Sequence, residues 1–420
     1  MFLRTMGLTI FALSYGIASL TTAEDLVTGF QSSVGVTRDT RIDWVYVLAN
    51  QSPRTVPADW LIDYDSKKQT YQLYVPRNYD PKKSYPLVLF VSPSDKATGF
   101  RNWQRVCEEQ QIVFAGPHDA GNNCEIRRRV RIILDVLDDV RRTYNVDTNR
   151  SYIGGFSGGG RIACSIAFAL PEYFGGVMPI CAAGDLREES WLRHRVIDRL
   201  SVAHVTGESD FNRGEVERFR GPMLADVGVR SRVWVVPKTG HTIPDVRALC
   251  EAFRWLEAAA PQRRTLAEQY PSSCLSHGEA VSRDDNARRL FEEAQLRVAK
   301  DATRYSGLMQ LKGILTRWPD LPQADAAKKI LLEHESADIR KWEEDDIAEQ
   351  RRFLFARAKG LDAYASGPLP KQYENQRSDM ASAAIQLWQV VIDDGQDPEM
   401  AAHARQRVPK LRELLNQDSR

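Results

Sequence analysis

The sequence predicts a protein of the α/β class, in which a mostly parallel sheet with helices on both faces is followed by an all-helical region. Strand-like and helix-like segments alternate from about residue 68 to 260, an order that favours parallel strands joined by helices. Beyond about residue 281 the strand pattern ends, and alanine, leucine, glutamate, lysine and arginine dominate. A hydrophobic fraction of 43% over 420 residues is enough for two or three domains with cores of their own.

The individual strands follow from hydrophobic patterning. Residues 70–75 alternate between polar and apolar side chains, as in a strand with one buried face. Residues 86–91 are continuously apolar, which is typical of a central strand covered on both faces. Further strands are expected at residues 112–115, 151–153, 176–180, 202–205 and 232–236.

Two helices are clearly patterned, at residues 125–144 and at about 244–259. The polar side of the first helix carries arginines and aspartates, among them Arg131 and Asp135 one turn apart. We interpret this side as solvent-exposed and not as an anion-binding site.

The N-terminus has the pattern of an export signal. Arg4 precedes an apolar run from Met6 to Leu20, and residues 21–23 are small. An uncleaved anchor is the alternative. The domains expected are a signal peptide at 1–23, an extension at 24–64, an α/β domain at 65–262, a linker at 263–280 and a helical domain at 281–420. The protein is therefore expected in the periplasm or outside the cell, without a membrane span after signal removal.

The helical region contains a weak internal repeat. Residues 308–311 (LMQL) precede Pro322, and residues 384–387 (AIQL) precede Pro398. Half of the 76-residue offset between the two prolines is close to a tetratricopeptide repeat of about 34 residues. The region is predicted to be tetratricopeptide-like, with an irregular helical bundle as the alternative.

Six cysteines lie between residues 107 and 274 without the paired spacing of a zinc site. In an exported protein, Cys250 with Cys274 and Cys164 with Cys181 are candidate disulfides. Buried free thiols are an equal alternative.

The stretch Gly155-Phe156-Ser157-Gly158-Gly159 lies between a predicted strand and a predicted helix. Glycines at 155 and 159 leave room for a sharp turn that holds the Ser157 hydroxyl above the sheet. The positive end of the helix dipole beside it stabilises developing negative charge. The pattern predicts Ser157 as a nucleophile.

A serine nucleophile needs a base and a group that orients the base. Asp210 and His241 follow two late strands, in the order serine, acid, histidine. His241 is the expected base and Asp210 its partner, with Glu208 and then Asp185 as alternative acids. His118 is a candidate pocket residue.

Two backbone N–H groups are expected to form an oxyanion hole. Gly158 follows the nucleophile and supplies one. The loop Ser92-Pro93-Ser94 follows an earlier strand, and because Pro93 has no N–H, Ser94 or a neighbour would supply the other.

Three segments carry a family resemblance: 144–147 (YNVD), 150–160 (RSYIGGFSGGG) and 171–177 (PEYFGGV). Over about residues 65–260 the chain resembles secreted esterases of the polyhydroxybutyrate-depolymerase and feruloyl-esterase group of the α/β-hydrolase superfamily. The resemblance implies ester hydrolysis through an acyl-serine intermediate, with no metal or organic cofactor. One departure is that the family's His-Gly pair near the oxyanion hole is replaced by Val91-Ser92-Pro93-Ser94.

The predicted function is an exported serine esterase acting on a small-molecule or polymer ester. One alternative is an inactive hydrolase-fold scaffold whose helical tail binds a protein partner. Another is a prolyl-oligopeptidase-like peptidase, although about 40 residues before the first expected strand cannot form the usual propeller. A net charge of +1 argues against a nucleic-acid partner. Deletion from about residue 281 is expected to spare an esterase but to disable a scaffold.

Overall fold

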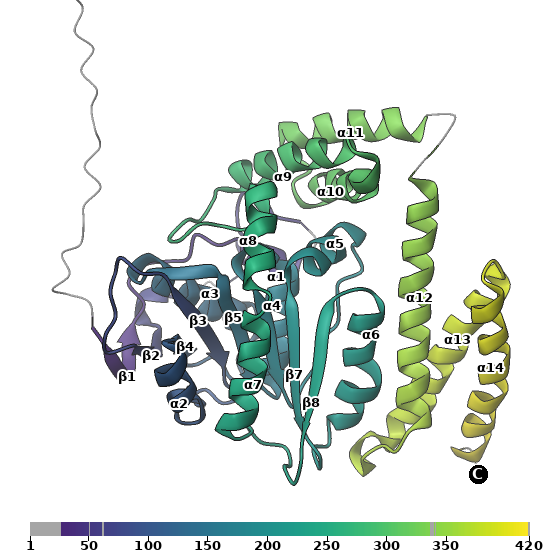
Figure 1. Cartoon of the computed structure of the whole chain (residues 1–420), viewed down its shortest axis with the longest axis horizontal. Helices are drawn as coiled ribbons and strands as arrows, with labels where there is room; N and C mark the ends of the chain where they lie inside the picture. Colours follow the sequence, from purple (N-terminus) through teal and green to yellow (C-terminus); the bar gives the residue numbers. More distant parts are fainter. Residues whose placement is uncertain (1–26, 50, 61–62, 337–339, 341, 419–420) are drawn as a thin grey trace, which may run out of the picture.

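The computed structural model describes residues 27–49, 51–60, 63–336, 340 and 342–418 (Figure 1). The predicted signal peptide lies outside these residues. Within the described ranges, no helix is both long and apolar enough to cross a membrane.

One eight-stranded sheet forms the centre of the molecule, in the order β1-β2-β4-β3-β5-β6-β7-β8. Strand β2 is antiparallel to both of its neighbours, and the strands from β4 to β8 are parallel. This confirms the predicted mostly parallel sheet. The strands are β1 (Gly29–Gly35), β2 (Thr70–Val75), β3 (Tyr85–Val91), β4 (Val113–Pro117), β5 (Val146–Phe156), β6 (Gly176–Ile180), β7 (Ser201–Gly207) and β8 (Arg230–Val236).

Helices cover both faces of this sheet. Alternate residues of a strand point to opposite faces, and β3 shows the result. Leu87 and Leu89 belong to one buried cluster with α3 and α4, while Val88 and Phe90 belong to a second with α2 and α7. The helices of this part are α1 (Val45–Leu48), α2 (Phe100–Gln110), α3 (Ile126–Thr143), α4 (Gly158–Ala169), α5 (Ser190–Arg199), α6 (Gly221–Asp226), α7 (Val246–Glu257) and α8 (Ala260–Gln269).

The solvent-exposed interpretation of the polar side of α3 is wrong. Asp135, Asp138 and Asp139 are almost completely buried, because residues 37–41 and 64–66 pack over them and donate hydrogen bonds to them. The Tyr64 hydroxyl donates to Asp135 at 2.6 Å, and the Arg41 guanidinium pairs with Asp138 at 2.6 Å. The expected Arg131–Asp135 pair is present at 3.1 Å, inside this covered network. Buried carboxylates are acceptable here because each has hydrogen-bond donors.

The six cysteines are all free. Cys164 belongs to the first buried cluster and Cys181 to the second, so the sheet separates them. Cys250 packs in the second cluster, whereas the Cys274 sulfur lies 3.2 Å from the Arg199 guanidinium. Neither candidate disulfide is therefore formed.

The chain beyond the sheet is helical, as predicted. Pro322 and Pro398, the two prolines of the sequence repeat, each begin a helix. Membership of the tetratricopeptide class stays a prediction. The helices are α9 (Arg283–Val298), α10 (Arg304–Arg317), α11 (Pro322–Glu335), α12 (Glu343–Ser366), α13 (Arg377–Asp394) and α14 (Pro398–Asp418).

The two ends of this helical region pack differently. Leu311 and Ile314 of α10, with Trp318 just beyond it, belong to the first buried cluster of the sheet-bearing part. Trp388 of α13 lies in a separate cluster between α12, α13 and α14. Helix α12 stands beside α6 and contributes side chains to both clusters (Figure 1).

Candidate active site

Ser157 occupies a strained turn between β5 and α4. Its φ of 52° and ψ of −123° are rare for a residue with a side chain. The turn is held because the Ser157 N–H donates to the Ile180 carbonyl at 2.9 Å, and its own carbonyl accepts from Gly160 at 2.9 Å. Strain of this kind persists where the surrounding structure fixes it, and it concentrates at functional sites.

The flanking glycines have the steric role that the sequence predicts. A Cβ on Gly155 would lie 2.4 Å from the Gly159 carbonyl carbon. A Cβ on Gly159 would lie 2.1 Å from the Val91 carbonyl oxygen. Any side chain at either position would force this turn to open.

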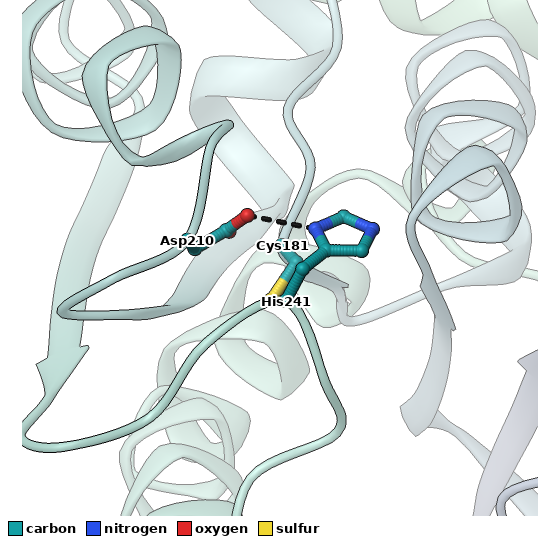
Figure 2. A group of neighbouring side chains, drawn as sticks. All are labelled: Cys181, Asp210 and His241. Atoms are coloured by element: carbon teal, nitrogen blue, oxygen red, sulfur yellow. Dashed lines mark hydrogen bonds and ion pairs between the residues drawn. The ribbon is translucent and has the colours of Figure 1, made fainter. Parts of the chain in front are cut away.

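A continuous hydrogen-bonded chain joins Ser157, His241 and Asp210. The His241 Nε2 atom lies 3.0 Å from the Ser157 Oγ. The Nδ1 atom lies 2.7 Å from the Asp210 Oδ1, the contact drawn as a dashed line in Figure 2. The Asp210 side chain has no exposed surface. The Thr206 hydroxyl donates to Asp210 Oδ2 at 2.6 Å, and the Asn212 N–H donates to Oδ1 at 3.0 Å. These donors fix the carboxylate that faces the imidazole.

The alternative acids have other partners. Glu208 accepts the Lys238 N–H at 2.8 Å, and Asp185 pairs with Arg220. Both ring nitrogens of His118 have partners outside the triad, since Nδ1 accepts the Ala97 N–H at 3.0 Å and Nε2 lies 2.9 Å from the Ser32 carbonyl oxygen. The geometry therefore singles out Asp210 as the partner of His241.

Aromatic side chains flank the His241 ring. Phe211 stacks on it with ring centroids 3.9 Å apart, and the Phe156 ring lies at 4.9 Å. Phe100 and Trp103, two other aromatics that follow β3, are instead buried in the core. Two hydrophobic rings thus restrict the orientation of the imidazole.

The surroundings of the expected oxyanion hole include one residue that the sequence did not indicate. Gly158 begins α4, so its N–H has no partner inside the helix. The Asn122 amide lies against it, because a Cβ on Gly158 would be 2.1 Å from Asn122 Oδ1. The Ser94 N–H donates to the Ser92 Oγ at 3.1 Å within its own loop. The sequence feature that could have indicated Asn122 is the polar loop Gly121-Asn122-Asn123, which follows β4.

Cys181 lies beside Asp210 and His241, and the potential metal-binding atoms of these three residues are all within 4.8 Å of one another (Figure 2). Burial, together with the nearby Asp210 carboxylate, raises the pKa of the Cys181 thiol to about 12. His241 Nδ1 and Asp210 Oδ1 are bonded to each other, so both of these atoms already have partners within the hydrogen-bonded chain.

No known protein family and no curated protein matches the sequence. Among solved structures, a thermostable esterase is 24% identical over 45% of this chain, with a TM-score of 0.34; the match spans 59% of that esterase, less than two thirds of its length. An S-formylglutathione hydrolase from Staphylococcus aureus is 15% identical over 45% of this chain and 92% of its own, with a TM-score of 0.35. An esterase from Thermogutta terrifontis is 16% identical over 49% and 89%, with a TM-score of 0.34. Similarity this low carries no argument about activity, which rests on the site itself.

Proposed function

We propose that this protein is a serine hydrolase that cleaves carboxylic esters through an acyl-serine intermediate. The observation that carries the proposal is the Ser157–His241–Asp210 hydrogen-bonded chain, with the serine on a strained turn at a helix N-terminus. Such a chain supplies a nucleophile, a base and an orienting carboxylate together.

In the proposed reaction, Ser157 Oγ bonds to the acyl carbon while its proton passes to His241 Nε2. The tetrahedral intermediate collapses, the bond to the alcohol oxygen breaks, and the alcohol takes the proton from Nε2. A water molecule then repeats the sequence, and the carboxylic acid and the Ser157 hydroxyl are released. Asp210 orients the imidazole and stabilises its positive charge.

The oxyanion would be stabilised at the start of α4. The Gly158 N–H and the helix dipole suit a developing negative charge. Asn122 provides an amide donor next to Gly158, so it is a better second-donor candidate than Ser94, whose N–H is engaged locally.

Several sequence predictions accompany this function as proposals: export to the periplasm or beyond, a small-molecule or polymer ester as substrate, the domain division near residues 263–280, and a protein partner for the helical region. The intact hydrogen-bonded chain favours an enzyme over an inactive scaffold. Measuring hydrolysis of a set of peptide substrates and a set of ester substrates side by side distinguishes the esterase from the peptidase alternative.

The direct test is labelling of the purified full chain with a fluorescent fluorophosphonate. Labelling is expected in the wild type and lost in Ser157→Ala. Ser165→Ala is the matched control, because Ser165 is an exposed serine on the same helix. A folded wild type that does not label, or a Ser157→Ala protein that labels normally, contradicts the proposal. Acetyl, feruloyl and hydroxyalkanoate esters would then define the acyl preference.

A further inference from the structure

The helical region reaches the candidate active site through a short segment between α12 and α13. This segment, a 3₁₀ helix at Lys371–Gln376, carries Tyr373. The Tyr373 hydroxyl donates a hydrogen bond to Asn212 Oδ1 at 3.0 Å, and its ring centroid lies 6.4 Å from that of Phe211. Residues far apart in the sequence thus meet beside Asp210.

Asn212 links Tyr373 to the triad aspartate. Its N–H donates to Asp210 Oδ1 at 3.0 Å, and its side-chain amide donates to the Cys181 carbonyl at 2.9 Å. Asn212 is only 3% exposed, so its amide oxygen depends on a protein donor, which Tyr373 supplies. Removal of the Tyr373 hydroxyl would leave this buried oxygen without that donor.

Phe211 provides a second connection of the same kind. It precedes Asn212 in the chain and stacks on the His241 ring at 3.9 Å, and its ring centroid lies 6.4 Å from that of Tyr373. A displacement of Tyr373 would therefore disturb both Asn212, which holds Asp210, and Phe211, which restricts the orientation of His241.

The position of Tyr373 is set by the way α12 is packed. The Arg218 guanidinium donates to the Pro368 carbonyl at 2.6 Å. A Cβ on Gly360 would lie 2.5 Å from the Phe219 ring, so α12 is in close contact with the segment that follows the Asp210 loop. In Figure 1, α12 runs alongside α6, and its lower end leads to α13. The docked helix thus places Tyr373 against Asn212.

We propose that Tyr373 is a positioning residue for the hydrolytic site. It holds Asn212 and Phe211, and through them Asp210 and His241, so the chemistry depends on a helical region that lies outside the sheet. This inference rests on the proposed serine hydrolase function.

The first test is Tyr373→Phe in the full chain, which removes one oxygen and keeps the ring. With a short-chain p-nitrophenyl ester, kcat is expected to fall by about tenfold, the effect of one lost hydrogen bond at the site. KM is expected to change by less than about twofold, because Tyr373 acts on the orientation of the triad. Titration of reactive serine with the fluorophosphonate normalises kcat to the competent fraction, so partial misfolding does not affect the comparison.

Tyr364→Phe is the matched control. Tyr364 lies on α12 and its ring stacks on Phe219, but it makes no contact with Asn212 among the bonds described. The same atom is removed from the same region, and kcat is expected to stay at the wild-type value. Equal effects of the two substitutions would overturn the proposal.

A second test separates positioning from a general structural effect. In an Asp210→Asn background, Tyr373→Phe is expected to cause little further loss in the rate of fluorophosphonate labelling, because its effect passes through Asp210. A full tenfold loss in that background would overturn the proposal. A wild type without Ser157-dependent activity would instead refute the hydrolase function, so the two failures are distinguishable.

Discussion

Two buried tryptophans show how differently the two ends of the helical region relate to the sheet. Trp318, after α10, lies in the core that also contains residues of β3 and α3, whereas Trp388 of α13 lies in a cluster shared only with α12 and α14. The first end is part of the body that carries the candidate site. The second is a docked unit that touches the site through Tyr373. Similar helical sequence therefore serves two structural roles.

This difference changes what a deletion would measure. Removal of everything beyond about residue 281 would strip Leu311, Ile314 and Trp318 from the central core. The truncated chain would test folding and not catalysis. Point substitutions in each part are the informative way to test the comparison.

The largest expected effect is that of Ser157→Ala, which tests whether the sheet-bearing part carries the chemistry at all. We expect kcat/KM for ester hydrolysis to fall by about 10⁴-fold or more, because the nucleophile is removed. Purified protein and a p-nitrophenyl acetate assay suffice for the measurement. Activity within tenfold of the wild type would show that the reactive group lies elsewhere.

Trp318→Ala and Trp388→Ala test the comparison most directly. Both side chains are fully buried, so each substitution is expected to cost about 3–5 kcal/mol of local stability. In urea, Trp318→Ala should lower the midpoints for loss of activity and for loss of helical circular dichroism together. Trp388→Ala should lower the midpoint of a helical transition that leaves the sheet-bearing part folded, and activity should fall only partly in that transition, because Tyr373 loses its place beside Asn212. Identical shifts in both variants would mean that the two ends unfold as one unit.

The attachment of α12 to α5 is expected to depend on acid pH. Burial alone would raise the pKa of Glu349, but the nearby His194 ring, the hydrogen bond from the Tyr305 hydroxyl and the charge of Arg193 outweigh it and lower the pKa to about 2. Because the folded pKa lies below the ordinary value of 4.5, the stabilisation is complete above about pH 4.5 and is lost as the pH falls towards 2.

Thermal unfolding between pH 6 and pH 3 measures this attachment. Glu349→Gln should flatten the fall in melting temperature over that range. Glu344→Gln, an exposed residue of the same helix, should leave the fall unchanged. A Glu349→Gln protein with the wild-type pH dependence would show that this contact contributes nothing to it.

The smallest effect is expected from Lys359→Gln. The pair between Lys359 of α12 and Asp226 of α6 is 2.9 Å long but substantially exposed. Exposed pairs contribute little, so the free energy of unfolding should fall by less than about 0.5 kcal/mol. A loss comparable to that of Trp388→Ala would indicate that charge, and not apolar packing, docks the helical region.

The sequence predicts the parts of the molecule that depend on local pattern. Seven of the eight strands were expected, since their apolar runs or alternation are visible in short windows. Strand β1 was not expected, because its residues are mostly exposed at the sheet edge and carry little hydrophobic signal. The strand–Ser157–helix arrangement was likewise apparent from the glycines and the flanking apolar residues.

Contacts between distant segments were beyond local pattern. Asp135 and Arg131 have the spacing of a surface pair, and only the path of residues 37–41 and 64–66 shows that Asp135 is buried. Asn122 and Tyr373 lie in segments with no periodicity, and their importance comes from Gly158 and Asn212, which are distant in the chain. The roles of these two side chains beside the triad could therefore be recognised only from the three-dimensional structure.

The covering of α3 by residues 37–41 and 64–66 also limits how far the N-terminus can be shortened. Asp135, Asp138 and Asp139 depend on donors such as Thr37, Arg41 and Tyr64. Proteolytic trimming past this segment would strip partners from three carboxylates in the interior, at a cost of several kcal/mol for each buried charge left unpaired. A shortened form of the protein must therefore retain the chain from about Val36 onward, and a recombinant form that begins later would be unstable.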